Sequence, residues 1–350
     1  MVATYKPRYI VVTDSCVAGV IGDDSAAVCQ EAEQEYGIPV LHVDCHGFLD
    51  GEYYGGFISA AKLLIDRFMA KKELPNVTSD QPYKVTLIGE KDGPGSMAIQ
   101  QFCALIEDFG LEIYKAFPGY CSIEDMQKIG ESDFTVILGG TQKAYAYLRE
   151  IADYMNEKLG ISHFASDYPI GWEGTRRWLD DFSVFLQNFK SDAKNHKIEI
   201  EAIKANVWRR FEEGFEPFKK TLQEASIVLS LGYINPNYDL SWVLEWIHLG
   251  NLSLAKVVIL DNVPETQQAM YRTMVQRFYP ETTIVLETAD TVLPKDALII
   301  TTQELAEPFL RQLILPCLPP IGMAGLVQMY RKLFMLARRR GERGIVLYGW

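Results

Sequence analysis

The six cysteines of this sequence are scattered, and no two of them form the Cys-x-x-Cys pair from which a chain builds a metal site on its own. The absence of that pair excludes a zinc ribbon and a self-contained ferredoxin motif. Disulfides are not expected either, because a reducing compartment keeps isolated cysteines as free thiols. A cluster in this chain would therefore draw its ligands from distant positions or from another subunit.

Long apolar runs and an excess of basic residues are also lacking. No run reaches the roughly 18–20 apolar residues that span a bilayer, and the first eight residues lack the apolar core of a signal peptide. The net charge of −12 argues against a nucleic-acid partner, because phosphate binding needs a basic face. The sequence therefore predicts a cytoplasmic protein that binds neither a membrane nor nucleic acid.

Apolar β-branched runs alternate along the chain with segments of helical periodicity, which is typical of parallel βαβ units. A polar, proline-bounded stretch at 71–82 reads as a linker. A helix is predicted over 304–313, among others. We therefore expect an α/β fold of several Rossmann-like parallel-sheet domains, the first one incomplete. The expected domains are residues 1–80, 81–223 and 224–350.

Cys16 lies in Ser15–Asp24, directly after the predicted strand Tyr9–Thr13 and before a predicted helix. Ligands gather at such strand-to-helix connections in open α/β sheets. A sulfur close to backbone N–H groups and a helix N-terminus is biased toward the thiolate, the form that binds metal. The alternative is a small apolar residue buried at the end of a strand. Gly22 permits the turn that follows.

Two further pairs are candidates for the same region. Asp23 and Asp24 could act as acid–base groups, but capping of the next helix is the stronger interpretation. Cys45 and His46 are adjacent soft ligands just beyond a strand. Because neighbours on an extended chain point to opposite sides, both rarely bind one metal. We expect them to line a cofactor or interface region, and His42 to be a packed or exposed strand residue.

Two glycine-containing turns, 93–96 and 139–141, could present N–H groups to an anion. Neither is a Walker sequence or a Gly-x-Gly-x-x-Gly fingerprint, so support for nucleotide binding is weak. The nearest basic candidates for an anionic ligand are Lys91, Lys143 and Arg176.

Ser15–Asp24 resembles the nitrogenase component 1 family, whose members carry a cluster-ligating cysteine before a Gly-Asp-Asp turn. The stretch Gly37–Phe48, followed by Gly51 and Gly55, is similar to a further motif of that family. Weaker similarities extend the resemblance along nearly the whole chain, at Pro82–Gly89, Leu159–Ile161, Trp172–Thr175 and Pro319–Gly325.

The resemblance implies a chelatase- and nitrogenase-like fold and a partner, a second component 1-like subunit in a homo- or heterodimer. Cysteines of both subunits would hold an interface iron–sulfur cluster, expected to be [4Fe–4S]. An ATP-dependent iron protein would deliver electrons for a small-molecule substrate. Carried over, Cys16 becomes the metal ligand, Gly19 and Gly22 support its turn, and Cys45 and His46 lie beside the cofactor.

The sequence departs from the family in three places. Only fifteen residues precede Cys16, so we expect this chain to lack the segment that carries further cluster cysteines in the family. No cysteine lies near Val136–Ala144 and no histidine in Pro319–Gly325, the positions that anchor the molybdenum cofactor in true nitrogenase. Cys317 is a loosely placed substitute. The resemblance therefore implies no molybdenum cofactor and a substrate other than dinitrogen.

Three functions remain open. The first is a nitrogenase-like oxidoreductase subunit that reduces a substrate such as a tetrapyrrole or an organosulfur compound. The second is a non-catalytic scaffold that holds a metallocluster during assembly. The third is a cluster-free protein that binds a small ligand between Rossmann-like domains.

Overall fold

The computed structural model describes residues 2–14, 17, 21–43, 53–71, 82–90, 97–138, 142–189, 199–234, 239–306, 310–316, 319–339 and 344–349. The chain divides into two compact units, Met1–Gly93 with Leu111–Ala165 (unit 1) and Pro94–Gly110 with Ser166–Trp350 (unit 2). The described strands form sheets of two, four and six strands, and all their pairs are parallel. The expected α/β fold of parallel sheets is therefore confirmed, and the boundaries after residues 80 and 223 stay a prediction.

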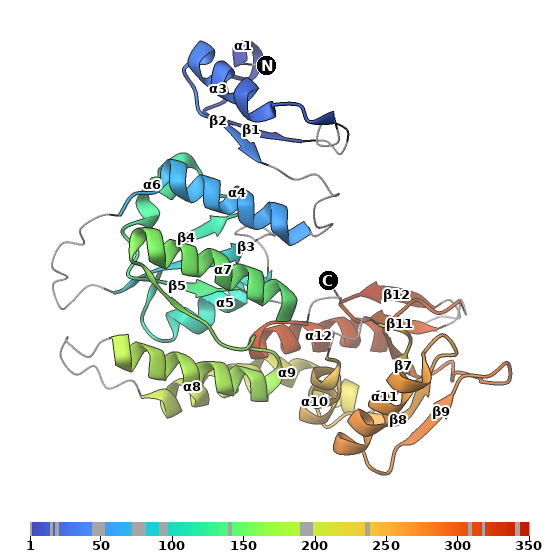
Figure 1. Ribbon diagram of the computed structural model, residues 1–350. Helices are drawn as coiled ribbons and strands as arrows, with labels where there is room; N and C mark the ends of the chain where they lie inside the picture. The colour runs from blue at the N-terminus through green and yellow to red at the C-terminus, as the bar shows by residue number, and fades with distance from the viewer. Residues whose placement is uncertain are drawn as a thin grey trace. The chain divides into compact units, whose positions relative to one another are not determined.

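The two-stranded sheet of unit 1 pairs β1 (Ile10–Thr13) with β2 (Val40–Val43), and α1 (Val2–Tyr5) precedes it. The connection between the strands contains α3 (Ser25–Tyr36), drawn in blue in Figure 1. Gly37 ends this helix in the left-handed conformation, with φ of 69°, and its N–H bonds to the Glu33 carbonyl. Glycine suits that cap because it has no Cβ to clash there.

The four-stranded sheet of unit 1 has the strand order β4-β3-β5-β6. Its strands are β3 (Lys84–Glu90), β4 (Glu112–Pro118), β5 (Phe134–Ile137) and β6 (Ser162–Phe164), and its helices are α4 (Tyr53–Phe68), α6 (Ile123–Ile129) and α7 (Gln142–Leu159). Figure 1 shows α4 and α7 side by side. Ile65 of α4 and Ile151 and Met155 of α7 belong to one buried cluster, whose apolar area accounts for the helical periodicity of both segments.

The six-stranded sheet of unit 2 has the order β12-β11-β10-β7-β8-β9. Its strands are β7 (Ser226–Leu231), β8 (Ser253–Ile259), β9 (Thr283–Leu286), β10 (Leu298–Thr301), β11 (Arg311–Ile314) and β12 (Ile345–Tyr348). The central strand β10 is buried at every residue. Such a continuous apolar run is typical of a parallel strand that has both faces covered.

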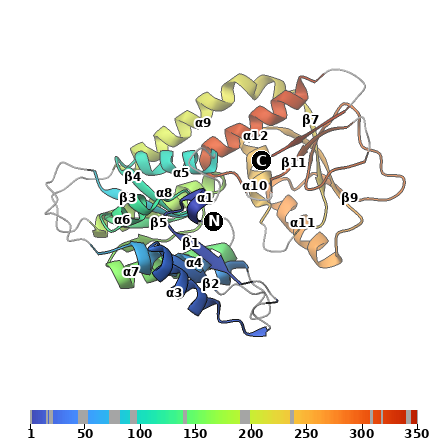
Figure 2. The same ribbon diagram turned by 90° about the horizontal axis from the view of Figure 1, so that it is seen from above.

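The helices of unit 2 are α5 (Met97–Glu107), α8 (Gly171–Phe189), α9 (Ile200–Gln223), α10 (Ser241–Leu249), α11 (Glu265–Phe278) and α12 (Gly322–Ala337). Figure 2 shows α9 and α12 running side by side. Their contact centres on Tyr330, whose ring lies 4.2 Å from that of Phe215. The Tyr330 hydroxyl donates to the Trp246 carbonyl over 2.5 Å, so α10 is tied to the same pair.

One predicted helix is wrong. Residues 311–313 of the expected 304–313 helix belong to β11, a strand that lies between β10 and β12. Leu305 is instead held by the buried Gln312 side chain, which accepts from its N–H over 2.8 Å and donates to its carbonyl over 2.9 Å.

Across the described ranges, no helix is both long enough and apolar enough to traverse a bilayer.

Candidate functional site

The carboxyl edge of the β1–β2 sheet is the first candidate site. The two strands run parallel with Thr13 beside Val43, so both chains leave the sheet at one edge. Cys16 follows Thr13 by three residues and Cys45 follows Val43 by two. The segments that contain Cys16 and Cys45 therefore both begin at the same edge of the sheet, although the two cysteines are far apart in the sequence. Four predicted site residues lie outside the described part of the chain: Cys16, Gly19, Cys45 and His46.

A side-chain hydrogen bond marks this edge. His42 Nε2 lies 2.9 Å from Asp14 Oδ2, and 17% and 9% of these two side chains are exposed. The contact ties the residue that follows β1 to the neighbouring strand β2. His42 is therefore a half-buried strand residue with a carboxylate partner, which agrees with the packed-residue interpretation.

The turn before α3 is built as predicted where the structure describes it. Gly22 has φ of 73°, in the left-handed region that favours glycine, and a Cβ there would meet nothing within 4 Å. The positive φ, and not a lack of room for a side chain, is therefore the reason that glycine is required at this position. The Asp24 carboxylate accepts from the Ala27 N–H over 3.0 Å and caps the helix. This confirms the capping role for Asp24, whereas a supporting role of Gly22 toward Cys16 stays a prediction.

The cysteines that the structure describes do not fit a cluster site. Burial raises the pKa of all three thiols, Cys29, Cys103 and Cys121, and that of Cys121 reaches about 12. Metal ligation needs the thiolate, which these surroundings disfavour. No three His, Cys, Asp or Glu side chains gather as a metal site within the described ranges. A cluster would therefore need thiolates from outside the described residues or from another subunit.

The carboxyl edge of the six-stranded sheet is a second candidate that the sequence did not reveal. From β7 the chain passes through α10 and α11 to β8 and β9 on one side, whereas β10 lies on the other side of β7. The chain therefore reverses direction between β7 and β10. Open α/β sheets bind ligands outside the carboxyl ends of their strands at such a reversal.

Neutral hydrogen-bonding groups converge at that reversal. The Gly232 N–H, just after β7, donates to Thr302 Oγ1 over 2.7 Å, just after β10. The buried Tyr271 hydroxyl donates to the Gly232 carbonyl over 2.9 Å. A Cβ on Gly232 would lie 2.4 Å from Gln303 Oε1, so the glycine allows this side chain to approach the backbone. Hydrogen bonds therefore hold both the N–H and the carbonyl of Gly232 in place.

Asn262, from the end of β8, completes this edge. Its Nδ2 donates to Gln303 Oε1 over 3.0 Å, and its Oδ1 accepts from the Tyr233 N–H over 3.2 Å. The Tyr233 side chain is 54% exposed at the same place. Amides and hydroxyls of this kind can recognise a polar ligand but offer no strong acid or base. In the sequence, the only sign of this site was a glycine directly after the buried strand β7. That glycine does not indicate that the ends of β7, β8 and β10 lie together.

Arg176 is less suited to an anionic ligand than the sequence suggested. It lies on α8 with its guanidinium 2.9 Å from Glu173 and 3.9 Å from Asp180. Its charge is therefore compensated by neighbours one turn away. The other two basic candidates fall where no side chain is described: Lys91 lies outside the described residues, and the Lys143 side chain is likewise not described.

Known proteins share this architecture. The solved structure of nitrogenase Cp1 at pH 5 aligns with a TM-score of 0.57 and 17% identity, over 96% of this chain and 72% of that one. The likeness concerns the fold, and it agrees with the nitrogenase-like fold that the sequence predicted.

Sequence relatives agree. The nitrogenase molybdenum-iron protein alpha chain of Methanosarcina barkeri is 23% identical over 66% of this chain and 41% of its own length. The nitrogenase iron-molybdenum cofactor biosynthesis protein NifE of Methanococcus maripaludis is 25% identical over 65% of this chain and 44% of its own length. The chain thus spans less than half the length of these curated relatives. A profile of the nitrogenase component 1 type oxidoreductases matches residues 1–242, more than half of the sequence. The chain therefore belongs to the nitrogenase component 1 type oxidoreductase family.

Proposed function

We propose that this chain is a subunit of a nitrogenase component 1-like oxidoreductase. In this proposal it pairs with a second component 1-like subunit, and Cys16 is one ligand of an iron–sulfur cluster at their interface. An ATP-driven iron protein supplies electrons through that cluster to a bound small molecule. The absence of a cysteine in 136–144 and of a histidine in 319–325 supports a substrate other than dinitrogen.

The observation that carries the proposal is the set of exposed apolar side chains close to Cys16 in the sequence. Val17 is 68% exposed and Ile21 is 67% exposed, one and five residues after Cys16. More exposed apolar side chains lie nearby in the sequence, at Tyr5, Val11, Val28 and Tyr36. Exposed apolar side chains that form a continuous patch are typical of protein–protein interfaces. A partner seated there would cover the segment that is proposed to hold the cluster.

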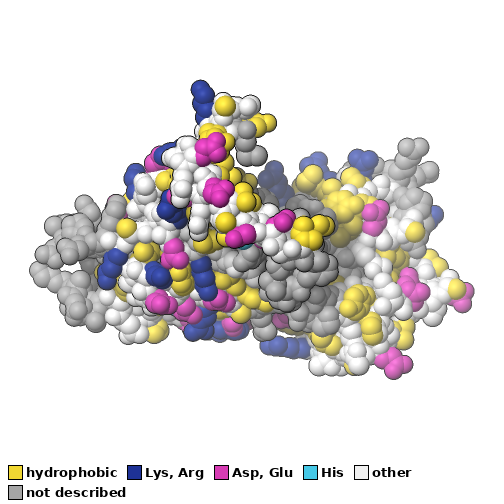
Figure 3. Space-filling model, turned by 45° about the horizontal axis from the view of Figure 1, so that its top comes forward, with side chains coloured by type: hydrophobic (Ala, Val, Ile, Leu, Met, Phe, Trp, Pro, Cys, Tyr) yellow, Lys and Arg dark blue, Asp and Glu magenta, His cyan; other side chains and the backbone are white. Residues whose placement is uncertain are grey.

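The charge of this region supports the same interpretation. From Asp23 to Tyr36 the chain carries five carboxylates and no lysine or arginine, and one of the five, Glu33, pairs with Arg67 of α4. Figure 3 shows hydrophobic and acidic side chains, with some Lys and Arg side chains among them, on a face that includes the N-terminal part of the chain. A partner with an apolar centre and basic residues around it would complement such a surface.

Iron and acid-labile sulfide analysis of anaerobically purified protein tests the proposal. The wild type is expected to hold about two to four iron atoms per chain or dimer, as [2Fe–2S] or [4Fe–4S] clusters do. Cys16→Ala should lose that iron. Cys103→Ala is the matched control and should keep it, because the Cys103 thiol has a raised pKa and does not favour ligation.

Two results would overturn the proposal. Iron that survives in Cys16→Ala would assign the cluster to other residues. A folded wild type without iron, purified together with its partner subunit, would favour the cluster-free ligand-binding function. The amides and hydroxyls between β7 and β10 would then be the first place to look for the ligand.

A scaffold for metallocluster assembly is the second candidate. It is favoured by the NifE relatives, whose name assigns them to iron-molybdenum cofactor biosynthesis. ATP-dependent substrate turnover with an iron protein separates the two functions. Turnover would support the oxidoreductase. Transfer of a bound cluster to an acceptor protein, without turnover, would support the scaffold.

A further inference from the structure

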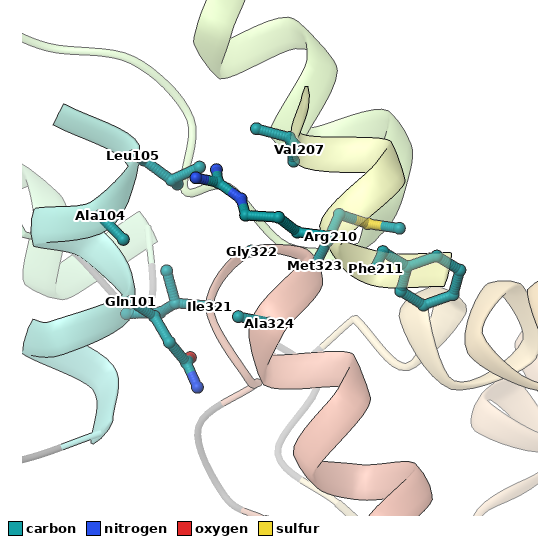
Figure 4. Close-up of a pocket in the computed structure, with 10 residues that line it drawn as sticks. All are labelled: Gln101, Ala104, Leu105, Val207, Arg210, Phe211, Ile321, Gly322, Met323 and Ala324. Atoms are coloured by element: carbon teal, nitrogen blue, oxygen red, sulfur yellow. The ribbon is translucent and has the colours of Figure 1, made fainter. Parts of the chain in front are cut away.

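Three helices of unit 2 line a partly open cavity that the proposed function does not use. The helices are α5, α9 and the first turn of α12, and the cavity has a volume of about 190 Å³. Figure 4 shows the side chains that line it, with Arg210 reaching across from α9 toward Leu105 of α5. Protein interiors are close-packed and contain few voids larger than a water molecule. A cavity of this size is therefore a feature to explain.

Most of the cavity wall consists of apolar side chains that are buried in the protein. Five of its side chains are at most 4% exposed: Leu105 from α5, Val207 and Phe211 from α9, and Ile321 and Met323 at the start of α12. Each is anchored in the core of unit 2 and still leaves the space beside it open. The wall therefore offers dispersion contacts to an occupant on all three sides.

The polar groups at the cavity carry no uncompensated charge. Arg210 Nη1 donates to Asp108 Oδ1 over 2.8 Å, and its second amino group contacts Asp108 Oδ2. Figure 4 shows the guanidinium reaching from α9 toward α5, so this bidentate pair links the two helices beside the opening. Gln101 supplies a neutral carboxamide that lies against α12, since a Cβ on Gly325 would be 2.9 Å from its Oε1.

We propose that this cavity binds a small, uncharged, apolar molecule about the size of one aromatic ring. A well-ordered water needs two to four polar partners, and the wall, which is mostly apolar apart from Gln101 and the paired Arg210, offers few of them. An apolar cavity of roughly 150 Å³ in another protein stays dry and binds benzene. A charged ligand would lose its hydration without gaining a counter-ion, because Arg210 is already paired. The ligand would bridge α5, α9 and α12 and so stabilise unit 2.

Benzene titration of the full-length protein tests this proposal, with Tm and calorimetry as readouts. A ligand that binds only the folded state raises Tm until the site is saturated. Benzene should produce such a shift, and benzoate, which adds a charge to the same ring, should bind at least about tenfold more weakly. Ala104→Leu fills the cavity from α5 and should reduce benzene affinity by about tenfold or more.

Two further variants make the test specific. Ala205→Leu adds the same side chain at an exposed position of α9 away from the cavity and should leave benzene binding unchanged. Ala324→Leu narrows the cavity from an exposed position on α12, so it tests the proposal even where Ala104→Leu fails to fold. No saturable benzene shift in the wild type would refute the site. An undiminished shift in both Ala104→Leu and Ala324→Leu would place the binding elsewhere.

Discussion

At the scale of single residues, the sequence identified the turn before α3 correctly because the signal there is local. Gly22 adopts positive φ and Asp24 caps the helix, and both follow from the chemistry of the residue itself. Gly232 is also a glycine at a turn, directly after β7, but there the glycine is required by the close approach of a side chain. Its partners Thr302 and Gln303 lie some 70 residues away. No local pattern could have placed them beside it.

Asp24 gives the first prediction. Asp24→Ala removes the side-chain acceptor of the Ala27 N–H, which costs about 1 kcal/mol at a helix N-cap. Amide hydrogen exchange in α3 should become about fivefold faster, the factor that corresponds to this energy. Asp23→Ala is the matched control and should change exchange much less, because the Asp24 carboxylate makes the capping bond. Equal effects of both variants would refute the capping role.

At the scale of secondary-structure elements, most helices and strands were predictable because apolar spacing follows burial. Residues 304–313 show where this fails. Their apolar residues fit a helical period, yet Pro308 interrupts it and residues 311–314 enter the sheet as β11. A short buried strand and a buried helix segment give similar apolar runs. The pairing of β11 with β10 and β12 decides between them, and that pairing is tertiary.

Gln312 is therefore expected to be sensitive to substitution. Gln312→Leu keeps the volume but leaves the Leu305 N–H and carbonyl without their partners, at a cost of about 1–3 kcal/mol for each group that stays buried. Urea denaturation of unit 2, followed by tryptophan fluorescence, measures the loss. Gln276→Leu, at an exposed position of α11, should cost under about 0.5 kcal/mol. A Gln312 variant as stable as that control would contradict this structural role.

Glu245 of α10 gives a pH-dependent prediction. Its Oε1 accepts from the Trp172 and Glu173 N–H groups over 3.1 and 3.0 Å at the start of α8, and burial raises its pKa. A raised carboxyl pKa in the folded state means that stability is present below the unfolded pKa and is lost as pH rises through the folded pKa. The Tm of Glu245→Gln should therefore improve relative to wild type from about pH 4 to about pH 7. A pH-independent Tm difference would contradict the assignment.

At the scale of the whole molecule, the parallel sheets followed from the βα alternation, but the grouping of elements did not. Helix α5 lies between β3 and β4 in the sequence and yet belongs to unit 2. It forms one wall of the cavity with α9 and α12, which are more than 90 residues further along the chain. The cavity therefore depends on tertiary contacts that hydrophobic periodicity does not encode.

Association with a partner is a prediction at this scale. Val28 on α3 is 64% exposed within the proposed interface, whereas Val292 in unit 2 is 75% exposed outside it. Val28→Lys should leave folding stability within about 0.5 kcal/mol and weaken association, because it places a charge in an apolar contact. Val292→Lys should leave association unchanged. Sedimentation of the assembled protein distinguishes these cases, and identical masses for both variants and wild type would remove α3 from the interface.

The most direct test of the central claim is the EPR spectrum of the anaerobic, reduced protein with its partner subunit. The account predicts a signal from a reduced iron–sulfur cluster in the wild type and in Cys103→Ala, and its loss in Cys16→Ala. Addition of an iron protein with MgATP should change the redox state of that cluster. A folded assembly without a signal, or a signal unchanged in Cys16→Ala, would contradict the assignment of Cys16 to an interface cluster.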